Sequence, residues 1–308
     1  MGTPDFAAGI LKCILSTHHE VVAVVTQPDR PKGRSGTLVA SPVKELALSN
    51  GIKVMQPQKI KEQGAVEELL TVDADIYVVA AFGQILSRRI LDIPKKGCIN
   101  VHASLLPEYR GAAPIQWAIA DGKKVTGVTI QQMNEGVDTG DIISRKEVEI
   151  NPDETGESLF NRLMYEGGIL TVKTLDMIEE GTAAFEPQDE SKATYAKILK
   201  KEMGLIDFSK SADEIERMIR AFTPWPGGYT YLNGKLLKIK KCHISDGPGG
   251  ENGRIISVTK DEITVSCARG SLVLTEVQSE GKRQMSVHDF LLGNPVKCGE
   301  VLGVTGND

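Results

Sequence analysis

Ile76-Tyr77-Val78-Val79-Ala80-Ala81 is a continuously apolar run, as expected of a central strand that is buried on both faces of a sheet. On both sides of this run, short β-rich stretches alternate with helical patterns. Strands are predicted at residues 21–26, 52–55, 76–82, 98–102 and 125–133, and helices near 42–50, 64–72, 84–92, 112–121 and 156–180. Because this alternation implies right-handed crossovers, residues 1–185 are predicted to form a Rossmann-like α/β domain with a mostly parallel sheet.

The last third of the chain has a different pattern. Residues 186–205 are polar and weakly periodic, which is typical of a linker. Ser211 and Glu214 have the spacing of a capping box at the start of a helix, and Asn233-Gly234 is a strong hairpin signal. Short strands are predicted at residues 229–232, 236–245, 253–259, 262–268 and 271–277. These strands and tight turns indicate that residues 206–308 form a small OB-like β-barrel.

The composition is that of an ordinary globular protein, with 41% hydrophobic and 25% charged residues. No apolar run approaches the roughly 20 residues of a membrane span. The first residues lack a signal-peptide pattern, so we expect a cytoplasmic protein without a membrane partner. The five cysteines are odd in number and widely spaced, which favours reduced thiols. His18 and His19 lack a cysteine or carboxylate at ligand spacing, so the sequence predicts a solvated turn and no metal.

The net charge of −5 argues against a general attraction to nucleic acid. Any contact with a nucleic acid therefore has to come from local basic patches. Two candidate patches are Lys32 with Arg34, and Lys235 with Lys238, Lys240 and Lys241. A solvated charged face is the alternative for each patch, and it is the more common case for a run of lysines alone.

The residues most suited to chemistry follow the next predicted strand, in the segment from Gly97 to Gln116. Strand side chains alternate, so Asn100 and His102 project from the same face. They lie at the carboxyl end of a strand, where open α/β sheets bind their ligands. An amide can donate to a developing oxyanion, and an imidazole can exchange a proton near neutral pH. The pair therefore suits acyl chemistry, although an Asn and a His at a strand end are more often structural than catalytic.

A second candidate segment is Glu135-Gly136-Val137-Asp138-Thr139-Gly140-Asp141. Two glycines around an acid predict a tight turn with an exposed carboxylate. If this turn lies near His102, Asp138 would fix the tautomer of the ring and favour its protonated form. Asp-Thr-Gly also occurs in aspartic proteases, but that mechanism requires a second such motif or a dimer, and an all-β fold. The first domain of this chain offers none of these.

Together the two segments resemble the signature of the folate-dependent formyltransferase family. The matching elements are Asn100, His102, Ser-Leu-Leu-Pro at 104–107, Arg-Gly at 110–111, Pro114 and Gly-Val-Asp-Thr-Gly at 136–140. The chain resembles in particular the members that act on initiator tRNA, over essentially its whole length. The stretches that carry this closer resemblance are GTPDFA at 2–7, TQPDRPKGR at 26–34, SPVK at 41–44 and RAFTPWP at 220–226.

The resemblance implies transfer of the formyl group of 10-formyltetrahydrofolate to the α-amine of methionine on initiator tRNA. It implies that Asn100, His102 and Asp138 are catalytic. The implied folate contacts are Phe82, Gly83, Ile85 and Leu86 in one loop, and Ser104, Leu105, Leu106 and Pro107 in another. The expected tRNA contacts are Arg34, Lys32, Lys238, Lys240 and Lys241. A monomer is expected, since one asymmetric tRNA requires one asymmetric surface.

Three other functions remain open from the residues alone. The same three catalytic residues could formylate a small molecule, such as an amino sugar or a glycinamide nucleotide, or hydrolyse formylfolate. The basic loop at 30–34 and the second domain argue against a small acceptor, which needs neither. A tRNA-binding module without catalysis would depend on the β-barrel alone.

The family resemblance also predicts a missing element. Relatives begin with a short apolar strand that leads into the turn matching Gly2-Thr3-Pro4-Asp5, whereas this sequence starts within that turn. Loss of an inner strand would leave unpaired backbone groups and unfilled apolar space. We therefore expect the natural chain to carry several more residues upstream, rich in Ile, Val and Phe.

Overall fold

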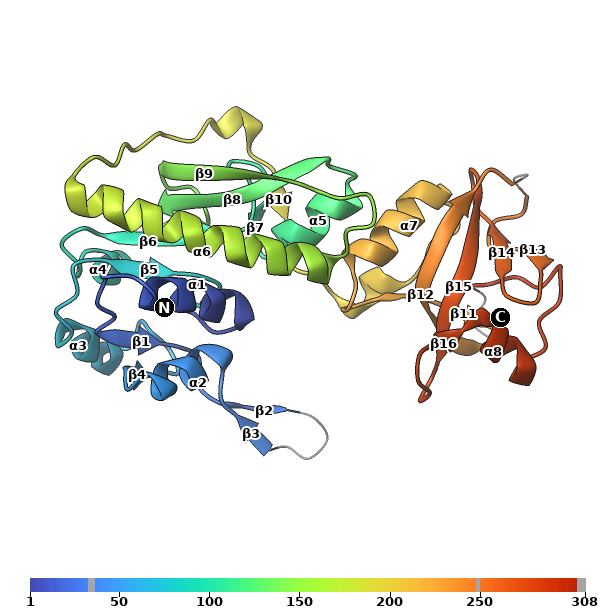
Figure 1. The fold of residues 1–308 in the computed structure, drawn as a ribbon, viewed down its shortest axis with the longest axis horizontal. Helices are drawn as coiled ribbons and strands as arrows, with labels where there is room; N and C mark the ends of the chain where they lie inside the picture. The colour runs from blue at the N-terminus through green and yellow to red at the C-terminus, as the bar shows by residue number, and fades with distance from the viewer. Residues whose placement is uncertain (33–36, 248–249, 304–308) are drawn as a thin grey trace. The chain divides into compact units, whose positions relative to one another are not determined.

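A computed structural model describes residues 1–32, 37–247 and 250–303 (Figure 1). The chain forms two compact units, each built from several segments. The first unit comprises Met1–Pro114, Val125–Glu149 and Phe160–Ala196, and the second comprises Ile115–Lys124, Ile150–Leu159 and the chain from Lys197 onward. Residues 186–196 of the expected linker thus belong to the first unit. None of the helices in the described ranges is both long and apolar enough to cross a membrane.

The strands of the first unit form the expected α/β sheet in two parts. They are β1 (Ala23–Val25), β4 (Lys53–Met55), β5 (Tyr77–Val79), β6 (Cys98–His102), β8 (Val125–Gln132) and β9 (Ile142–Glu149). β1 pairs with β4, and the other four have the order β5-β6-β8-β9. The β1–β4 and β5–β6 pairs are parallel, whereas β8 and β9 extend the sheet in antiparallel fashion. β9 was not predicted, because its centre is polar and exposed.

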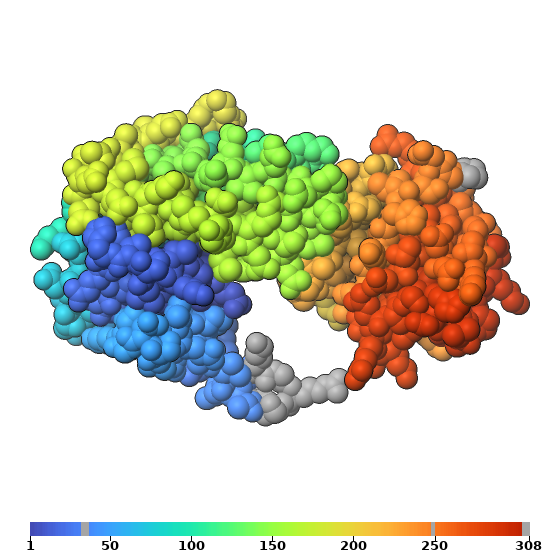
Figure 2. Space-filling view, in the orientation of Figure 1, coloured from blue at the N-terminus to red at the C-terminus, as the bar shows by residue number. Residues whose placement is uncertain are grey.

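Helices flank these strands. They are α1 (Asp5–Leu15), α2 (Pro42–Ser49), α3 (Gln63–Leu70), α4 (Arg88–Leu91) and α6 (Gly156–Glu180). α5 (Pro114–Ala120) belongs, except for its first residue, to the second unit. α4 is shorter than the helix predicted at 84–92. Figure 2 shows α1 and α6 side by side, and an edge-to-face contact of 5.6 Å between the rings of Phe6 and Phe160 joins them. Gly9 and Gly168 permit this approach, since a Cβ at either would overlap a side chain of the opposite helix.

The sheet is divided between β1 and β5, where no strand pairing occurs among the described residues. The first two residues lie in this gap: Met1 exchanges backbone hydrogen bonds with the strand at Val78 and Ala80, and the Gly2 amide donates to the Val25 carbonyl. Beyond Met1 lies a cavity of about 520 Å³. Its apolar lining includes Ile10, Leu11, Ile14, Val24, Met55 and Tyr77. The cavity therefore continues the path of an extended segment between the two strands.

The buried amino terminus predicts a pH dependence for a chain that begins at Met1. Burial lowers the pKa of its α-ammonium group from 8.0 to about 6. Between these values the unfolded state binds a proton that the folded state does not, so the free energy of unfolding falls as the pH is lowered from 8 to 6. The expected fall is about 2–3 kcal/mol in total. Urea titrations across this range will measure it, and acetylation of the amine is expected to abolish it. Equal pH dependence of both forms would contradict this assignment.

The second unit is rich in β-structure, as predicted. Its larger elements are α7 (Ala212–Ala221), β11 (Gly228–Leu232), β12 (Lys235–Ser245), β13 (Ile255–Val258), β14 (Ile263–Ser266), β15 (Ser271–Ser279), β16 (Met285–Ser286) and α8 (Val287–Gly293). The capping box of Ser211 and Glu214 is confirmed, and the hairpin at Asn233-Gly234 joins β11 to β12.

The strands of this unit form one six-stranded sheet in the order β11-β12-β15-β14-β13, with β16 beside β15. The described strands make no pairing that closes the sheet into a complete barrel. Instead, residues 299–303 lie between its two edges. The Leu302 amide donates to the Gly253 carbonyl next to β13, and the Gly303 amide donates to Tyr231 of β11. The unit is therefore a curved sheet whose ends are bridged by this segment.

Candidate active site

Two polar side chains of β6 lie where the sequence predicts them. β6 runs between parallel β5 and antiparallel β8, and it pairs Asn100 with Gln131 and His102 with Thr129. Asn100 and His102 share one face of the strand, and both contact Asp138. His102 is buried, with 6% of its surface exposed, and Asn100 is half-buried. The predicted grouping of the three residues at one edge of the sheet is thus present in the structure.

Asp138 is the centre of the site. Its Oδ1 accepts hydrogen bonds from the Asn100 amide at 3.3 Å and the Gln131 amide at 2.9 Å. Its Oδ2 accepts the Gly111 backbone N–H at 2.9 Å and lies 3.5 Å from Nδ1 of His102. Asp138 has a positive φ of 55°, which is tolerated by aspartate better than by most residues. Four neighbours therefore fix the orientation of one carboxylate.

The His102 ring lies between two oxygen acceptors. Its Nε2 is 2.9 Å from the Tyr109 carbonyl oxygen, and its Nδ1 faces Asp138. A protonated ring can donate to both oxygens, whereas a neutral ring can donate to only one. The arrangement therefore accommodates the cationic ring that forms when His102 takes up a proton.

Two glycines of the quoted motifs are required by close backbone contacts. Gly111 has a φ of 109°, and a Cβ there would lie 2.8 Å from the Ala196 carbonyl oxygen. A Cβ at Gly140 would overlap the carbonyl group of Gln132. Glycine at these positions lets the backbone approach closely enough to present the Gly111 N–H to Asp138.

Gln131 is a part of the site that the sequence reasoning missed. It is buried on β8, directly opposite Asn100. Besides donating to Asp138, its side-chain oxygen accepts the Gly140 N–H at 3.2 Å, so it holds both sides of the turn. A buried polar residue on a strand needs partners, and this requirement was the available signal. Finding the partners of Gln131 from this signal, however, requires the antiparallel register of β8.

A second missed group ties the expected linker to the catalytic turn. The Gln188 amide donates to the backbone carbonyls of Asp138 and Gly140, at 2.9 and 2.7 Å. Its side-chain oxygen accepts hydrogen bonds from the fully buried Arg110 guanidinium. Arg110 also makes two hydrogen bonds to Glu190, which raise the pKa of the guanidinium. Residues 188–190 thus stabilise the turn that contains Asp138 through these hydrogen bonds.

The predicted folate loop at 104–107 follows β6 directly. Ser104 is fully buried, and its hydroxyl donates to the Glu108 carbonyl at 2.6 Å. The Leu106 N–H donates to the Thr129 hydroxyl of β8 at 3.1 Å. Leu106 is buried, whereas Leu105 and Pro107 are partly exposed. This loop is therefore fixed to the sheet next to His102.

The predicted pterin loop at 82–86 follows β5, which is parallel to β6, so both loops lie at the same edge of the sheet. Phe82 and Leu86 pack into the hydrophobic core. Gly83 and Ile85 are exposed. A second cavity, also of about 520 Å³, lies at this edge. It is lined by residues that include Thr3, Gln27, Arg30, Ser41, Phe82 and Gly83.

The predicted tRNA contacts that the structure describes belong to strands β12 and β2 (Arg30–Lys32). Lys238, Lys240 and Lys241 are on β12, where Lys238 and Lys240 are half-buried and Lys241 is exposed. The backbone of Lys32 pairs with Thr37 in the hairpin of β2 and β3 (Thr37–Val39). Arg34 lies outside the described residues. All of these tRNA contacts stay predictions.

Cysteine chemistry is disfavoured at this site. Cys98 lies on β6, two positions before Asn100, and burial raises the pKa of its thiol to about 12. Such a thiol is not a nucleophile at neutral pH. The fold and the site therefore define an α/β enzyme in which an amide, an imidazole and a carboxylate lie in contact at one edge of the sheet.

Comparison with known proteins identifies the family. A model of the formyl transferase family matches residues 1–175, and a model of the formyl transferase C-terminal domain matches residues 198–295. The chain belongs to the formyl transferase family, and the resemblance drawn from the sequence is confirmed. Similar proteins are the methionyl-tRNA formyltransferases of Agathobacter rectalis, 53% identical over 97% of both chains, and of Lachnospira eligens, 50% identical over 98% of both.

Solved structures show the same fold. WlaRD, described as a sugar 3N-formyl transferase, has a TM-score of 0.67 and 21% identity, and the match covers 92% of this chain and 97% of WlaRD. An N-formyltransferase from Helicobacter canadensis, in complex with folinic acid and dTDP-3-aminofucose, has a TM-score of 0.68 and 22% identity, over 90% and 97% of the two chains. Because the identities are low, these structures support the fold and not the acceptor.

Proposed function

We propose that this chain transfers the formyl group of 10-formyltetrahydrofolate to the α-amine of methionyl initiator tRNA, a step of translation initiation. The observation that carries the proposal is the contact of Asp138 with both Asn100 and His102 at the carboxyl edge of the sheet. The two relatives described above, both named methionyl-tRNA formyltransferase, support this acceptor because they match the chain over almost its whole length. We further propose that this enzyme works in the cytoplasm, and we expect it to be a monomer.

In the proposed reaction the methionyl α-amine attacks the formyl carbon. A new C–N bond forms, and the carbonyl oxygen becomes an oxyanion. One N–H of the Asn100 amide donates to Asp138, and the amide has a second N–H that can donate to the oxyanion. Because Asp138 holds the amide in advance, little reorganisation is needed as charge develops.

The tetrahedral intermediate then collapses. The bond between the formyl carbon and N10 of the folate breaks, and the proton lost by the amine ends on N10. Both nitrogens of His102 face protein oxygens, so the ring carries this proton when one of these contacts opens, and Asp138 stabilises the ring while it is charged. The products are N-formylmethionyl-tRNA and tetrahydrofolate, without a covalent enzyme intermediate.

The donor site is proposed to lie between the loops at 82–86 and 104–107, which the parallel strands β5 and β6 place at one edge of the sheet. The proposed contacts of the bound folate are the exposed Gly83 and Ile85 and the partly exposed Leu105 and Pro107. Phe82, Leu86, Ser104 and Leu106 are buried, so they shape these loops and contribute through their backbones.

One assay distinguishes this function from its alternatives. Formyl transfer from labelled 10-formyltetrahydrofolate is measured with charged initiator tRNA, charged elongator tRNA, a sugar amine or water as the acceptor. The proposal requires a kcat/KM for initiator tRNA at least 100-fold above that for each other acceptor, a difference of about 2.7 kcal/mol. Comparable rates with the sugar amine would favour the small-molecule alternative, and release of formate alone would indicate a hydrolase.

Replacement of Lys238, Lys240 and Lys241 together by glutamine is expected to weaken tRNA binding. If each lysine neutralises a phosphate, the slope of log K against log salt should fall in magnitude by about 2–3. Filter binding at several salt concentrations measures this slope. Lys260→Gln is the matched control, because Lys260 is an exposed lysine of the same unit outside β12. An unchanged slope in the triple variant would show that the tRNA binds elsewhere.

A further inference from the structure

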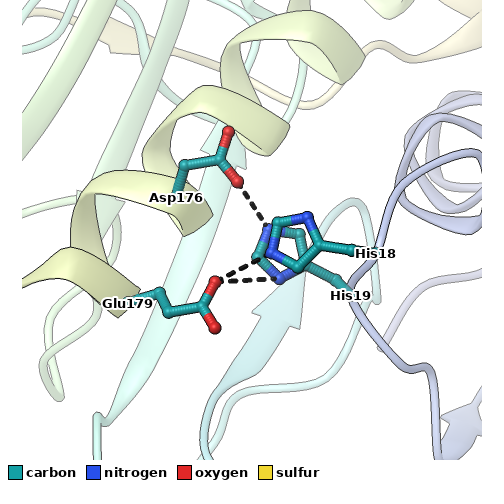
Figure 3. A group of neighbouring side chains, drawn as sticks. All are labelled: His18, His19, Asp176 and Glu179. Atoms are coloured by element: carbon teal, nitrogen blue, oxygen red, sulfur yellow. Dashed lines mark hydrogen bonds and ion pairs between the residues drawn. The ribbon is translucent and has the colours of Figure 1, made fainter.

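Four metal-ligating side chains gather on the first unit, away from the active site. His18 and His19 lie in the connection between α1 and β1, and Asp176 and Glu179 lie on α6 (Figure 3). Nε2 of His18 is 2.9 Å from Oε2 of Glu179, and Nε2 of His19 is 3.0 Å from Oδ1 of Asp176. Nδ1 of His19 is 3.9 Å from the same Glu179 oxygen. One ligand atom from each residue can be chosen so that all four lie within 4.8 Å of one another.

The surrounding structure holds these side chains in place. Asp176 and Glu179 are three residues apart on α6, so they project from the same face of the helix. The turn that carries the histidines is closed by the Thr17 hydroxyl, which donates to the Ile14 carbonyl and accepts the His19 N–H. One hydrogen-bonded turn and one helix therefore present two ligands each.

We propose that His18, His19, Asp176 and Glu179 bind one divalent transition-metal ion of the Zn²⁺ class. Zn²⁺ binds imidazole nitrogen at about 2.0–2.1 Å and carboxylate oxygen at about 2.0–2.2 Å, usually as a tetrahedron. A tetrahedron with these bond lengths has edges of about 3.3–3.5 Å. Two such edges correspond to the contacts of 2.9 Å between His18 and Glu179 and 3.0 Å between His19 and Asp176, which are a few tenths of an ångström shorter. The contact of 3.9 Å uses the other nitrogen of the His19 ring and is not an edge of the same tetrahedron. Shifts of a few tenths of an ångström in the two shorter contacts, with a larger approach of the more distant atoms, complete the site.

The donor set selects the class of metal. Two imidazoles with two carboxylates suit Zn²⁺ and its transition-metal neighbours, whereas Mg²⁺ and Ca²⁺ prefer oxygen ligands alone. All four positions are filled by protein side chains, which is the arrangement of a structural zinc site. Without metal the same side chains form partly exposed ion pairs, which contribute little stability. The ion would therefore tie the connection between α1 and β1 to α6.

The test is a titration of the full chain with Zn²⁺, followed by calorimetry, after removal of metal with a chelator. We expect one ion per chain and a higher melting temperature with Zn²⁺ but not with Mg²⁺. Co²⁺ in place of Zn²⁺ should give the visible absorption of a tetrahedral site. The titration is done in a Cys298→Ser background, because the exposed Cys298 thiol could bind Zn²⁺ by itself.

His19→Ala and Asp176→Asn are each expected to weaken Zn²⁺ binding by at least tenfold and to abolish the Co²⁺ absorption. Both variants should keep the metal-free melting temperature within a few degrees, which shows that they fold. The matched controls are Glu180→Gln, the next carboxylate on α6, and His288→Ala, a half-buried histidine that pairs with Asp261. Each control should change the affinity less than twofold. The proposal would be overturned if His19→Ala and Asp176→Asn left the Zn²⁺ affinity unchanged. It would also be overturned if the control variants lost as much Zn²⁺ affinity as these two.

Discussion

Replacement of Asp138 by alanine is expected to lower kcat for formyl transfer by roughly 10²–10³-fold or more, with little change in tRNA binding. The carboxylate accepts hydrogen bonds from Asn100, Gln131 and the Gly111 backbone, and it faces His102. Its removal releases the amide that is proposed to stabilise the oxyanion and leaves the His102 cation without its counter-charge. Single-turnover rates and tRNA affinity are measured separately, so that chemistry is distinguished from binding.

The control for this variant is Asp141→Ala. Asp141 is an exposed carboxylate of the same segment, three residues further along the chain, and its loss should leave the rate within twofold. His102→Ala should be as damaging as Asp138→Ala, and the double variant little worse than either, since residues that act as one unit are not additive. If Asp138→Ala retains half of the wild-type turnover, the role assigned to this carboxylate is wrong.

Addition of about six strand-forming apolar residues ahead of Met1 is expected to raise the melting temperature by on the order of 10 °C. The added segment would enter the cavity between β1 and β5 and pair with the backbone of both strands. Each apolar side chain that becomes buried contributes about 1.5–3 kcal/mol, and 1 kcal/mol corresponds to about 2–4 °C in a chain of this kind. The free-energy cost of deprotonating the buried Met1 amine would also be removed.

Calorimetry of the two chains measures this effect, and formyl transfer shows whether the active site gains as well. An extension of the same length made of glycine and serine is the control, because it offers the backbone but no apolar side chains. The control should raise the melting temperature much less than the apolar strand does. Equal melting temperatures of the unextended and apolar chains would show that the divided sheet is complete without an added strand.

Several features were determined by the sequence alone, because they depend on local periodicity and turn chemistry. The apolar run at 76–81 contains a strand with a parallel neighbour, as predicted. Asn100 and His102 share a face because strand side chains alternate, whatever the strand pairs with. Asn233-Gly234 forms its hairpin because both residues tolerate the positive φ values that the turn requires. The resemblance to the family signature then indicated Asp138 as the third candidate residue of the site.

Only the tertiary structure decided which distant residues complete each site. Gln131 reaches Asp138 because β8 pairs with β6 in an antiparallel register that no local pattern specifies. Gln188 reaches the same turn across 50 residues. His19, predicted to lie in a solvated turn without ligands, meets Asp176 across 157 residues because α1 and α6 pack side by side. Such contacts depend on how whole elements pack, so the spacing of residues along the chain does not contain them.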